Sequence, residues 1–381
     1  MKITIIGWYG TETIGDRAIL CGLLSFFAKV FNHFEISLGS LYPFFSERLL
    51  KEDSKFWKEI TGKDLEVNIF NSKKSSELNE SIRKSDLVVV GGGPLMHIEE
   101  LFMVEYAFKK AKKLKKQTAL LGCGIGPLFY KEFTKSVNEI ALKADLIVLR
   151  DSKSKDTLLE INKSYKMQLN KDNIFTSIDP SIECILEYNK ITPKANDSYI
   201  TANLREFPSD YSKKKIDKYK EMLIFIKALA EKYNDNKIKL TPMHYFHSGN
   251  DDRVFLNKIA FELEKANISV QNKILTLKET INVFQNAYFN IGMRYHSIIL
   301  QTIASGKNYI LDYTQPQKGK ISGFVSDIDD QNFYKDRYVN LQNDNISMKI
   351  INNEEKVFVF NSSLVERKNK IYLEKLRELN L

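Results

Sequence analysis

The strongest constraint on the fold is an alternation of short apolar runs with longer amphipathic segments, which occurs twice along the chain. In the first half the apolar runs lie at 2–7, 34–38, 65–70, 86–92, 117–124 and 145–150. After a polar stretch they return at 199–204, 237–243, 289–293 and 308–313. Apolar strands separated by helices are typical of parallel sheets that are covered on both faces. The sequence therefore predicts an α/β protein with two Rossmann-like domains and a cleft between them.

The length of the chain supports this division. With 381 residues, 43% of them hydrophobic, the chain exceeds the size at which a single core stops growing. We predict an N-terminal domain over 1–186, a linker over the polar segment 187–198 and a C-terminal domain over 199–361. The last segment, 362–381, is predicted to form an amphipathic helix that begins at a serine cap.

Charge and cysteine usage narrow the function classes. The net charge of +9 favours anionic partners. The lysine cluster at 109–116 falls on the polar face and last turn of a predicted helix, where cations suit the helix dipole, so we expect no nucleic-acid partner. The three cysteines are widely spaced and lack metal-ligand spacing, which predicts a reducing, cytosolic setting without disulfides. The N-terminal MKITIIG is typical of a strand and not of a signal peptide, and no apolar run reaches about 18 residues.

Glycines follow several strands of the first half. In GWYGTETIGDRAIL (7–20), Gly15 leaves backbone N–H groups open to a ligand where a helix begins. The neighbouring Asp16 either caps that helix or contacts a sugar hydroxyl. In VVVGGGPLMH (88–97), Gly92 and Gly93 allow the close approach of a ligand, or else form a packing turn. Arg150 ends another strand and is either a ligand contact or half of a surface ion pair.

Cations and an imidazole follow the strands of the second half. Arg205 and Arg294 each come at a strand end, so both are predicted on the same edge of one parallel sheet. Two guanidiniums there suit a small ligand that carries both a carboxylate and a phosphate. His296 follows at a helix N-terminus, as a site residue or as an ordinary core histidine. His244 and His247 have metal-ligand spacing but no third ligand in sequence, so no metal is predicted.

These motifs resemble, in order and spacing, those of the polysaccharide pyruvyltransferase family. The matching segments are GTETIGDRAIL, VVVGGGPL, GCGIGPL, RDSKS, IDPS and GMRYHS, followed by YTQPQKGKISGF (313–324), which contains Lys320. The resemblance implies a fold similar to the GT-B glycosyltransferase fold, with the acceptor on the N-terminal domain and the donor on the C-terminal one. Thr13 and Arg17 depart from the family's pattern, on what the resemblance makes the acceptor side.

The resemblance also implies an activity. Members transfer a pyruvyl group from phosphoenolpyruvate onto two hydroxyls of a sugar in a cell-surface polysaccharide or its lipid-linked precursor, forming a cyclic ketal and releasing phosphate without a cofactor. By motif position, it implies that Arg205, Arg294 and His296 are donor-site residues. Because an imidazole can carry its proton near neutral pH, we predict His296 as the general acid of this reaction, and Asp16 as a general base for the acceptor hydroxyl. The remaining predicted substrate-binding residues are Gly15, Gly92, Gly93, Arg150 and Lys320.

Two other functions remain open at the level of sequence. A nucleotide-sugar-dependent glycosyltransferase of the GT-B type would need a carboxylate for the ribose in the second domain, where only Asp312 is offered after a strand. A non-catalytic protein could instead sense a phosphorylated ligand. The positive charge predicts a cytoplasmic protein that associates peripherally with the inner face of the cytoplasmic membrane.

Overall fold

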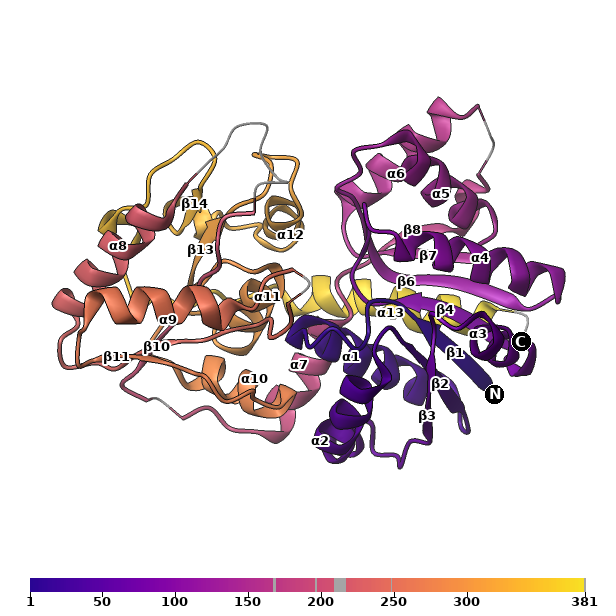
Figure 1. Cartoon of the computed structure of the whole chain (residues 1–381), viewed down its shortest axis with the longest axis horizontal. Helices are drawn as coiled ribbons and strands as arrows, with labels where there is room; N and C mark the ends of the chain where they lie inside the picture. Colours follow the sequence, from indigo (N-terminus) through magenta and orange to yellow (C-terminus); the bar gives the residue numbers. More distant parts are fainter. Residues whose placement is uncertain (167–168, 196, 209–216, 248, 380–381) are drawn as a thin grey trace. The chain divides into compact units, whose positions relative to one another are not determined.

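The computed structural model describes residues 1–166, 169–195, 197–208, 217–247 and 249–379. The chain forms two compact units, each with its own parallel sheet (Figure 1). The first unit contains Met1–Thr11, Asp16–Cys184 and Ser362–Leu381, and the second contains Glu12–Gly15 and Ile185–Asn361. The chain therefore passes from one unit to the other at four points, after Thr11, Gly15, Cys184 and Asn361.

The sheet of the first unit has the order β3-β2-β1-β4-β6-β7-β8, and β5 pairs with β6. Its central strands are apolar and buried because helices cover both faces of the sheet, and Ile5 of β1 pairs with Val89 of β4. The strands are β1 (Lys2–Ile6), β2 (Glu35–Ser40), β3 (Val67–Asn71), β4 (Leu87–Gly91), β5 (Pro94–Leu95), β6 (Gln117–Ile125), β7 (Leu146–Leu149) and β8 (Ile174–Thr176). The helices are α1 (Ile14–Val30), α2 (Pro43–Thr61), α3 (Ser75–Lys84), α4 (Glu100–Lys113), α5 (Lys131–Leu142), α6 (Ser152–Ser164), η1 (Lys171–Asn173) and the start of α7 (Ser181–Ile191).

The C-terminal helix α13 (Ser362–Glu378) belongs to the first unit. The buried ring of Tyr372 stacks on Phe26 at 4.5 Å, and its hydroxyl donates to the carbonyl of Ile178 at 2.7 Å. Asn369 donates to the buried carboxylate of Glu183 at 2.8 Å. The predicted C-terminal helix is therefore part of the first core, although it follows the second unit in sequence.

The sheet of the second unit has the order β11-β10-β9-β12-β13-β14. Its strands are β9 (Ile200–Asn203), β10 (Ile238–Leu240), β11 (Ile268–Val270), β12 (Asn290–Gly292), β13 (Asn308–Asp312) and β14 (Tyr338–Asn340). Its helices are α8 (Tyr219–Lys232), α9 (Asp252–Leu263), α10 (Leu277–Asn286), α11 (Tyr295–Ala304), α12 (Lys320–Ile328), η3 (Phe333–Asp336) and η4 (Met348–Ile350). Thr276 and Glu279 form a capping box that begins α10.

The structure confirms the predicted α/β class with two parallel sheets. The predicted linker over 187–198 is wrong in its first part, because 187–191 form the last turns of α7. The last residues of α7 are held in the second unit, where Tyr188 bonds Asn282 at 3.2 Å and Asn189 donates to the carbonyl of Ile303 at 3.1 Å. The three cysteines are free and buried, as predicted. Among the described residues, no helix combines the length and the apolar character needed to cross a membrane.

Candidate functional site

The second sheet reverses its strand order between β9 and β12, and this is where open α/β sheets bind ligands. Arg205 follows β9 and Arg294 follows β12, so the structure places both arginines at this point. Asn203, the last residue of β9, is fully buried. Its Nδ2 donates to the carbonyl of Thr241 at 2.9 Å, and its Oδ1 accepts from the backbone N–H of Arg294 at 2.9 Å. One amide side chain thereby fixes the ends of three strands relative to one another.

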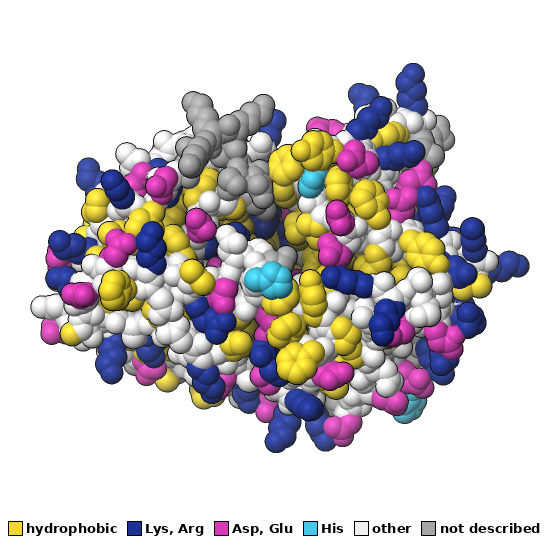
Figure 2. Space-filling model, in the orientation of Figure 1, with side chains coloured by type: hydrophobic (Ala, Val, Ile, Leu, Met, Phe, Trp, Pro, Cys, Tyr) yellow, Lys and Arg dark blue, Asp and Glu magenta, His cyan; other side chains and the backbone are white. Residues whose placement is uncertain are grey.

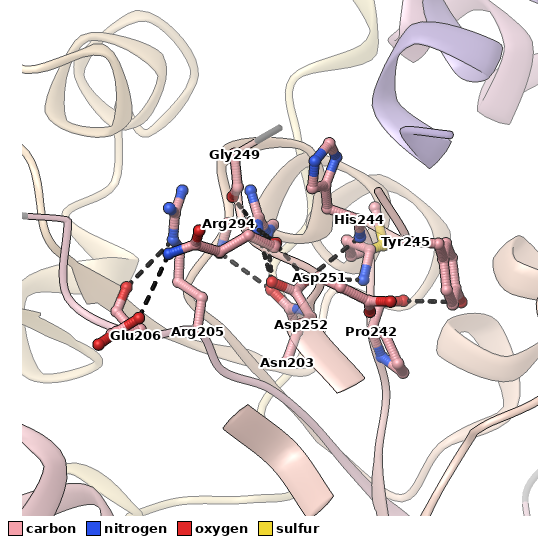
Figure 3. Close-up of polar contacts among 12 residues, drawn as sticks. Asn203, Arg205, Glu206, Pro242, His244, Tyr245, Gly249, Asp251, Asp252 and Arg294 are labelled. Carbon is pink, nitrogen blue, oxygen red and sulfur yellow. Dashed lines mark hydrogen bonds and ion pairs between the residues drawn. The ribbon is translucent and has the colours of Figure 1, made fainter. Parts of the chain in front are cut away.

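Arg294 is held by a buried carboxylate (Figure 3). Its Nε donates to both oxygens of Asp252 at 2.8 Å, and its Nη2 donates to Asp252 Oδ1 at 2.6 Å. Nη2 also donates to the carbonyls of Gly249 and Asn250. The two donors on Nη1 make no hydrogen bond with any described residue. Asp252 therefore fixes the plane of the Arg294 guanidinium and leaves the Nη1 donors for an anion.

Asp252, the first residue of α9, is fixed in turn by the loop after β10. Its Oδ2 accepts from the backbone N–H groups of Met243 and His244, at 3.0 and 3.2 Å. Such charge-assisted bonds from backbone N–H groups stabilise the carboxylate. The Asp252 side chain is 1% exposed, so the pair with Arg294 is shielded from water on the aspartate side.

The segment Glu12–Gly15 joins this edge of the second unit. Its backbone bonds the loop after β10, from Ile14 N–H to the carbonyl of Met243 at 3.1 Å and from Tyr245 N–H to the carbonyl of Glu12 at 3.2 Å. Thr13 Oγ1 and His244 Nδ1 lie 2.9 Å apart. Thr13 was expected on the acceptor side, but the structure groups it with the second unit, as a contact of His244.

Gly15 lies against His296, the second residue of α11. A Cβ added at Gly15 would lie 2.0 Å from His296 Nδ1 and 2.4 Å from Cγ, so no larger residue fits while the ring stays in place. His296 is half-buried and packs edge-on against Tyr295, with ring centroids 5.0 Å apart. Its place in the first turn of α11 lies where helix N–H groups favour anions.

Lys320, Arg205 and Arg294 surround the phenol of Tyr313, which follows β13. The Arg205 guanidinium carbon lies 5.4 Å from the centre of the Tyr313 ring, and Lys320 Nζ lies 5.8 Å from it. Burial alone would raise the pKa of Tyr313, but the three cations together lower it below its ordinary value. Burial raises the pKa of the neighbouring Asp312 above its ordinary value. The structure therefore brings Arg205, Arg294 and Lys320 together as one cationic site.

The glycines predicted in the first unit pack against aromatic side chains. Gly92 and Gly93 have φ values of +109° and +71°, which suit glycine. A Cβ at Gly92 would lie 3.0 Å from Tyr9 Oη, and one at Gly93 would lie 2.4 Å from Trp8 Cδ1. The indole of Trp8 in turn donates to the carbonyl of Pro94 at 3.0 Å. The packing interpretation explains both glycines, and a substrate contact at either stays a prediction.

Arg150 is buried, so the surface ion pair considered for it is wrong. Its Nη1 lies 3.5 Å from Asp179 Oδ2 and its Nε lies 3.5 Å from Asp151 Oδ2. Asp151 accepts from Ser154 N–H and caps α6, and Asp179 accepts from Ser181 N–H at the start of α7. Arg150 therefore lies between the carboxylates that begin two helices.

Asp16 lies in the first turn of α1, which begins at Ile14, two residues before the predicted start. It is therefore inside the helix and is not its N-cap, and it is 8% exposed. The next residue, Arg17, forms a buried ion pair with Asp53 at 2.7 Å and also contacts Glu52 at 2.9 Å. The buried carboxylate of Asp53 explains why an arginine occupies position 17.

Three residues of the second-unit site were not identified from the sequence: Asn203, Asp252 and Tyr313. Asp252 is the second aspartate of GNDDRVF, a pattern that indicates a helix start and nothing more. Tyr313 is the first residue of the YTQPQKGK segment, so its spacing from Lys320 could have indicated it.

Comparisons with known proteins give the family of the chain. Residues 14–313 match the family described as polysaccharide pyruvyl transferase. The chain belongs to this family. No curated protein matches the chain.

Solved structures show what the fold is similar to. UDP-GlcNAc 2-epimerase from Neisseria meningitidis is 14% identical, with 99% of each chain covered and a TM-score of 0.60. A glycosyl transferase of family 9 from Veillonella parvula is 12% identical, with 98% of this chain and 97% of that chain covered and a TM-score of 0.41. Escherichia coli heptosyltransferase WaaC is 13% identical, with 82% and 88% covered and a TM-score of 0.40. The fold of this polysaccharide pyruvyl transferase family member is GT-B-like.

Proposed function

We propose that the protein transfers a pyruvyl group from phosphoenolpyruvate onto two hydroxyls of one sugar, in a cell-surface polysaccharide or its lipid-linked precursor. The observation that carries the proposal is the cationic site of Arg205, Arg294 and Lys320 at the switch point of the second sheet. Phosphoenolpyruvate carries a carboxylate and a phosphate a few bonds apart, and two guanidiniums together with one ammonium suit both groups. Membership of the pyruvyl transferase family supports the same reaction.

The chemistry balances without a cofactor. The methylene carbon of phosphoenolpyruvate gains a proton, and the first sugar hydroxyl bonds to C2 and loses its own proton. The bond between C2 and the phosphate oxygen then breaks, phosphate leaves with the electron pair, and the second hydroxyl bonds to C2 and loses its proton. In this proposal Arg205, Arg294 and Lys320 hold the anions and stabilise the leaving phosphate. His296 supplies the proton to the methylene carbon, and Asp16 accepts a hydroxyl proton.

Calorimetric titration with phosphoenolpyruvate tests the donor site. Arg294→Lys keeps the positive charge but loses the planar set of guanidinium N–H donors. Because a charge-assisted hydrogen bond is worth about 1.5–3 kcal/mol, the affinity for phosphoenolpyruvate should fall about 10- to 100-fold. Arg253→Lys is the matched control, because Arg253 forms the same kind of pair with Asp251, at the same end of α9. The control should keep the wild-type affinity.

Two results would contradict the proposal. Wild-type affinity in Arg294→Lys would place the donor elsewhere. Binding of a UDP-sugar together with no binding of phosphoenolpyruvate by the wild-type protein would favour the glycosyltransferase alternative.

A further inference from the structure

Five aromatic rings gather on the first unit. The His97 ring lies 4.0 Å from the Phe133 ring, 4.7 Å from Tyr130 and 5.5 Å from Phe129, and Phe102 lies 5.1 Å from Phe133, all between centroids. Phe133 is buried, whereas Phe102, Phe129 and Tyr130 are 41%, 53% and 60% exposed. We name Phe102, Phe129 and Tyr130, with His97 and Phe133 beneath them, the aromatic platform. Figure 2 shows hydrophobic side chains gathered around a histidine in this region of the first unit.

The aromatic platform is fixed in place by the backbone. His97 N–H donates to the carbonyl of Pro127 at 3.0 Å, and Gly126 N–H donates to the carbonyl of Leu95 at 2.8 Å. The hydroxyl of Tyr165 donates to the carbonyl of Lys131 at 3.0 Å, which holds the start of α5. Rings that are ordered before a ligand arrives bind it at a lower entropic cost.

The position of the aromatic platform is that of a ligand surface. Phe129 and Tyr130 follow β6, and His97 follows β5, which pairs in parallel with β6. They therefore lie at the carboxyl edge of the first sheet, the edge at which open α/β sheets bind ligands.

The chemistry of the exposed side chains favours a sugar as the ligand. Among the described residues, every exposed large hydrophobic side chain of the first unit is aromatic: Phe44, Phe102, Tyr106, Phe129 and Tyr130. Those of the second unit are aliphatic except for Phe261. Ring faces carry partial negative charge, and the C–H groups on one face of a pyranose carry partial positive charge, so the two stack.

We propose that the aromatic platform binds a pyranose ring of the saccharide acceptor. This inference rests on the proposed pyruvyl transfer and assigns the acceptor to a surface of its own. A lipid bilayer also accommodates exposed aromatic rings, and the test below separates it from a sugar.

Saturation-transfer NMR with methyl pyranosides of the gluco, galacto and manno configurations tests the inference on the full chain. The wild-type protein should transfer saturation to the C–H protons of one sugar face. Removing both rings in Phe129→Ala/Tyr130→Ala should weaken binding about 2- to 10-fold per ring. Tyr130→Phe keeps the ring and should keep the signal. Phe44→Ala removes an aromatic side chain that is 72% exposed on α2 of the same unit, and it should change nothing.

Three outcomes of this experiment would contradict the inference. If no sugar receives saturation from the wild-type protein, or if the double variant keeps the full signal, the inference is wrong. It is equally wrong if the double variant keeps the sugar signal but loses co-sedimentation with phosphatidylglycerol vesicles, which would assign the aromatic platform to a membrane. Titration of the same double variant with phosphoenolpyruvate separates the two proposals, because donor affinity should be unchanged whether or not the sugar binds.

Discussion

Gly15 and His296 lie in contact although 281 positions separate them, because the Glu12–Gly15 segment is built into the second unit. This contact leads us to propose a positioning role for Gly15, and the substrate contact expected from the sequence stays a prediction. Because Gly15 has no side chain, the imidazole of His296 can occupy its position in the first turn of α11.

A double-mutant cycle tests this role. Gly15→Ala should displace the His296 ring and lower the rate of pyruvyl transfer, since the added methyl would overlap it. His296→Ala should lower the rate by roughly 10²–10⁴, the usual worth of a general acid, while donor affinity stays close to wild type. In the His296→Ala background, Gly15→Ala should have little further effect. Equal rate losses in both backgrounds would show that Gly15 acts independently of the histidine.

Tyr313 predicts a pH dependence with a definite sign. Its folded-state pKa lies below the ordinary tyrosine value of about 10, so the folded chain binds fewer protons than the unfolded chain between those two values. The free energy of unfolding should therefore rise with pH across that window, and this contribution should be lost as the pH falls through the lowered pKa.

Tyr313→Phe removes the titrating group and keeps the ring. In urea denaturation followed by circular dichroism from neutral to alkaline pH, the variant should lack the wild-type rise in stability. A difference titration of phenolate absorbance, wild type minus variant, should show one tyrosine that ionises before the others. Parallel pH curves for the two proteins would contradict the assigned pKa direction.

Sequence reasoning located the cations of this site but not the groups that hold them. Arg205, Arg294 and Lys320 each follow a strand end or begin a helix, and such positions can be read from periodicity. Asn203 and Asp252 act through contacts with Arg294 across 91 and 42 positions of sequence, and a single sequence does not indicate such pairings.

At the scale of elements, apolar runs predicted the central strands, which are buried on both faces. β4, with LVVVG, and β13, with NYILD, are fully buried, and both were predicted from their apolar runs. The two-residue strand β5 was not predicted. The strands β8, β11 and β14 were also missed. They are three-residue strands at sheet edges and are partly exposed, so they lack a continuous apolar run.

The helix α13 illustrates a second limit of prediction from sequence. Its amphipathic pattern gave the bounds of the helix but not the core against which the helix packs. The packing of Tyr372 now predicts its effect on stability. Tyr372→Ala removes a fully buried ring and should destabilise the first unit by about 3–5 kcal/mol. Lys370→Ala changes an exposed residue of the same helix and should stay within about 0.5 kcal/mol of wild type.

Tryptophan fluorescence is the appropriate reporter for this pair of variants. Both tryptophans of the chain, Trp8 and Trp57, lie in the first unit, so the signal in urea follows that unit alone. An unchanged fluorescence midpoint in Tyr372→Ala would show that α13 does not stabilise the first unit.

At the scale of the whole molecule, the net charge of +9 supports the proposal of peripheral association with an anionic membrane. Attraction to anionic lipid is worth about 1 kcal/mol for each basic residue near the surface, and salt screens it. Co-sedimentation with phosphatidylglycerol vesicles should therefore be strong at low salt and should disappear as salt is added. Equal binding to neutral phosphatidylcholine vesicles would rule out an electrostatic origin.

The central claim is that the cationic site of the second unit uses phosphoenolpyruvate as a pyruvyl donor. The most direct measurement is NMR of a surface-glycan fraction incubated with the protein and carbon-13-labelled phosphoenolpyruvate. The account predicts a labelled ketal methyl and a labelled quaternary carbon on the glycan, one phosphate released for each ketal formed, and loss of both products in Arg294→Lys but not in Arg253→Lys. Consumption of a UDP-sugar with no label transferred to the glycan would contradict it.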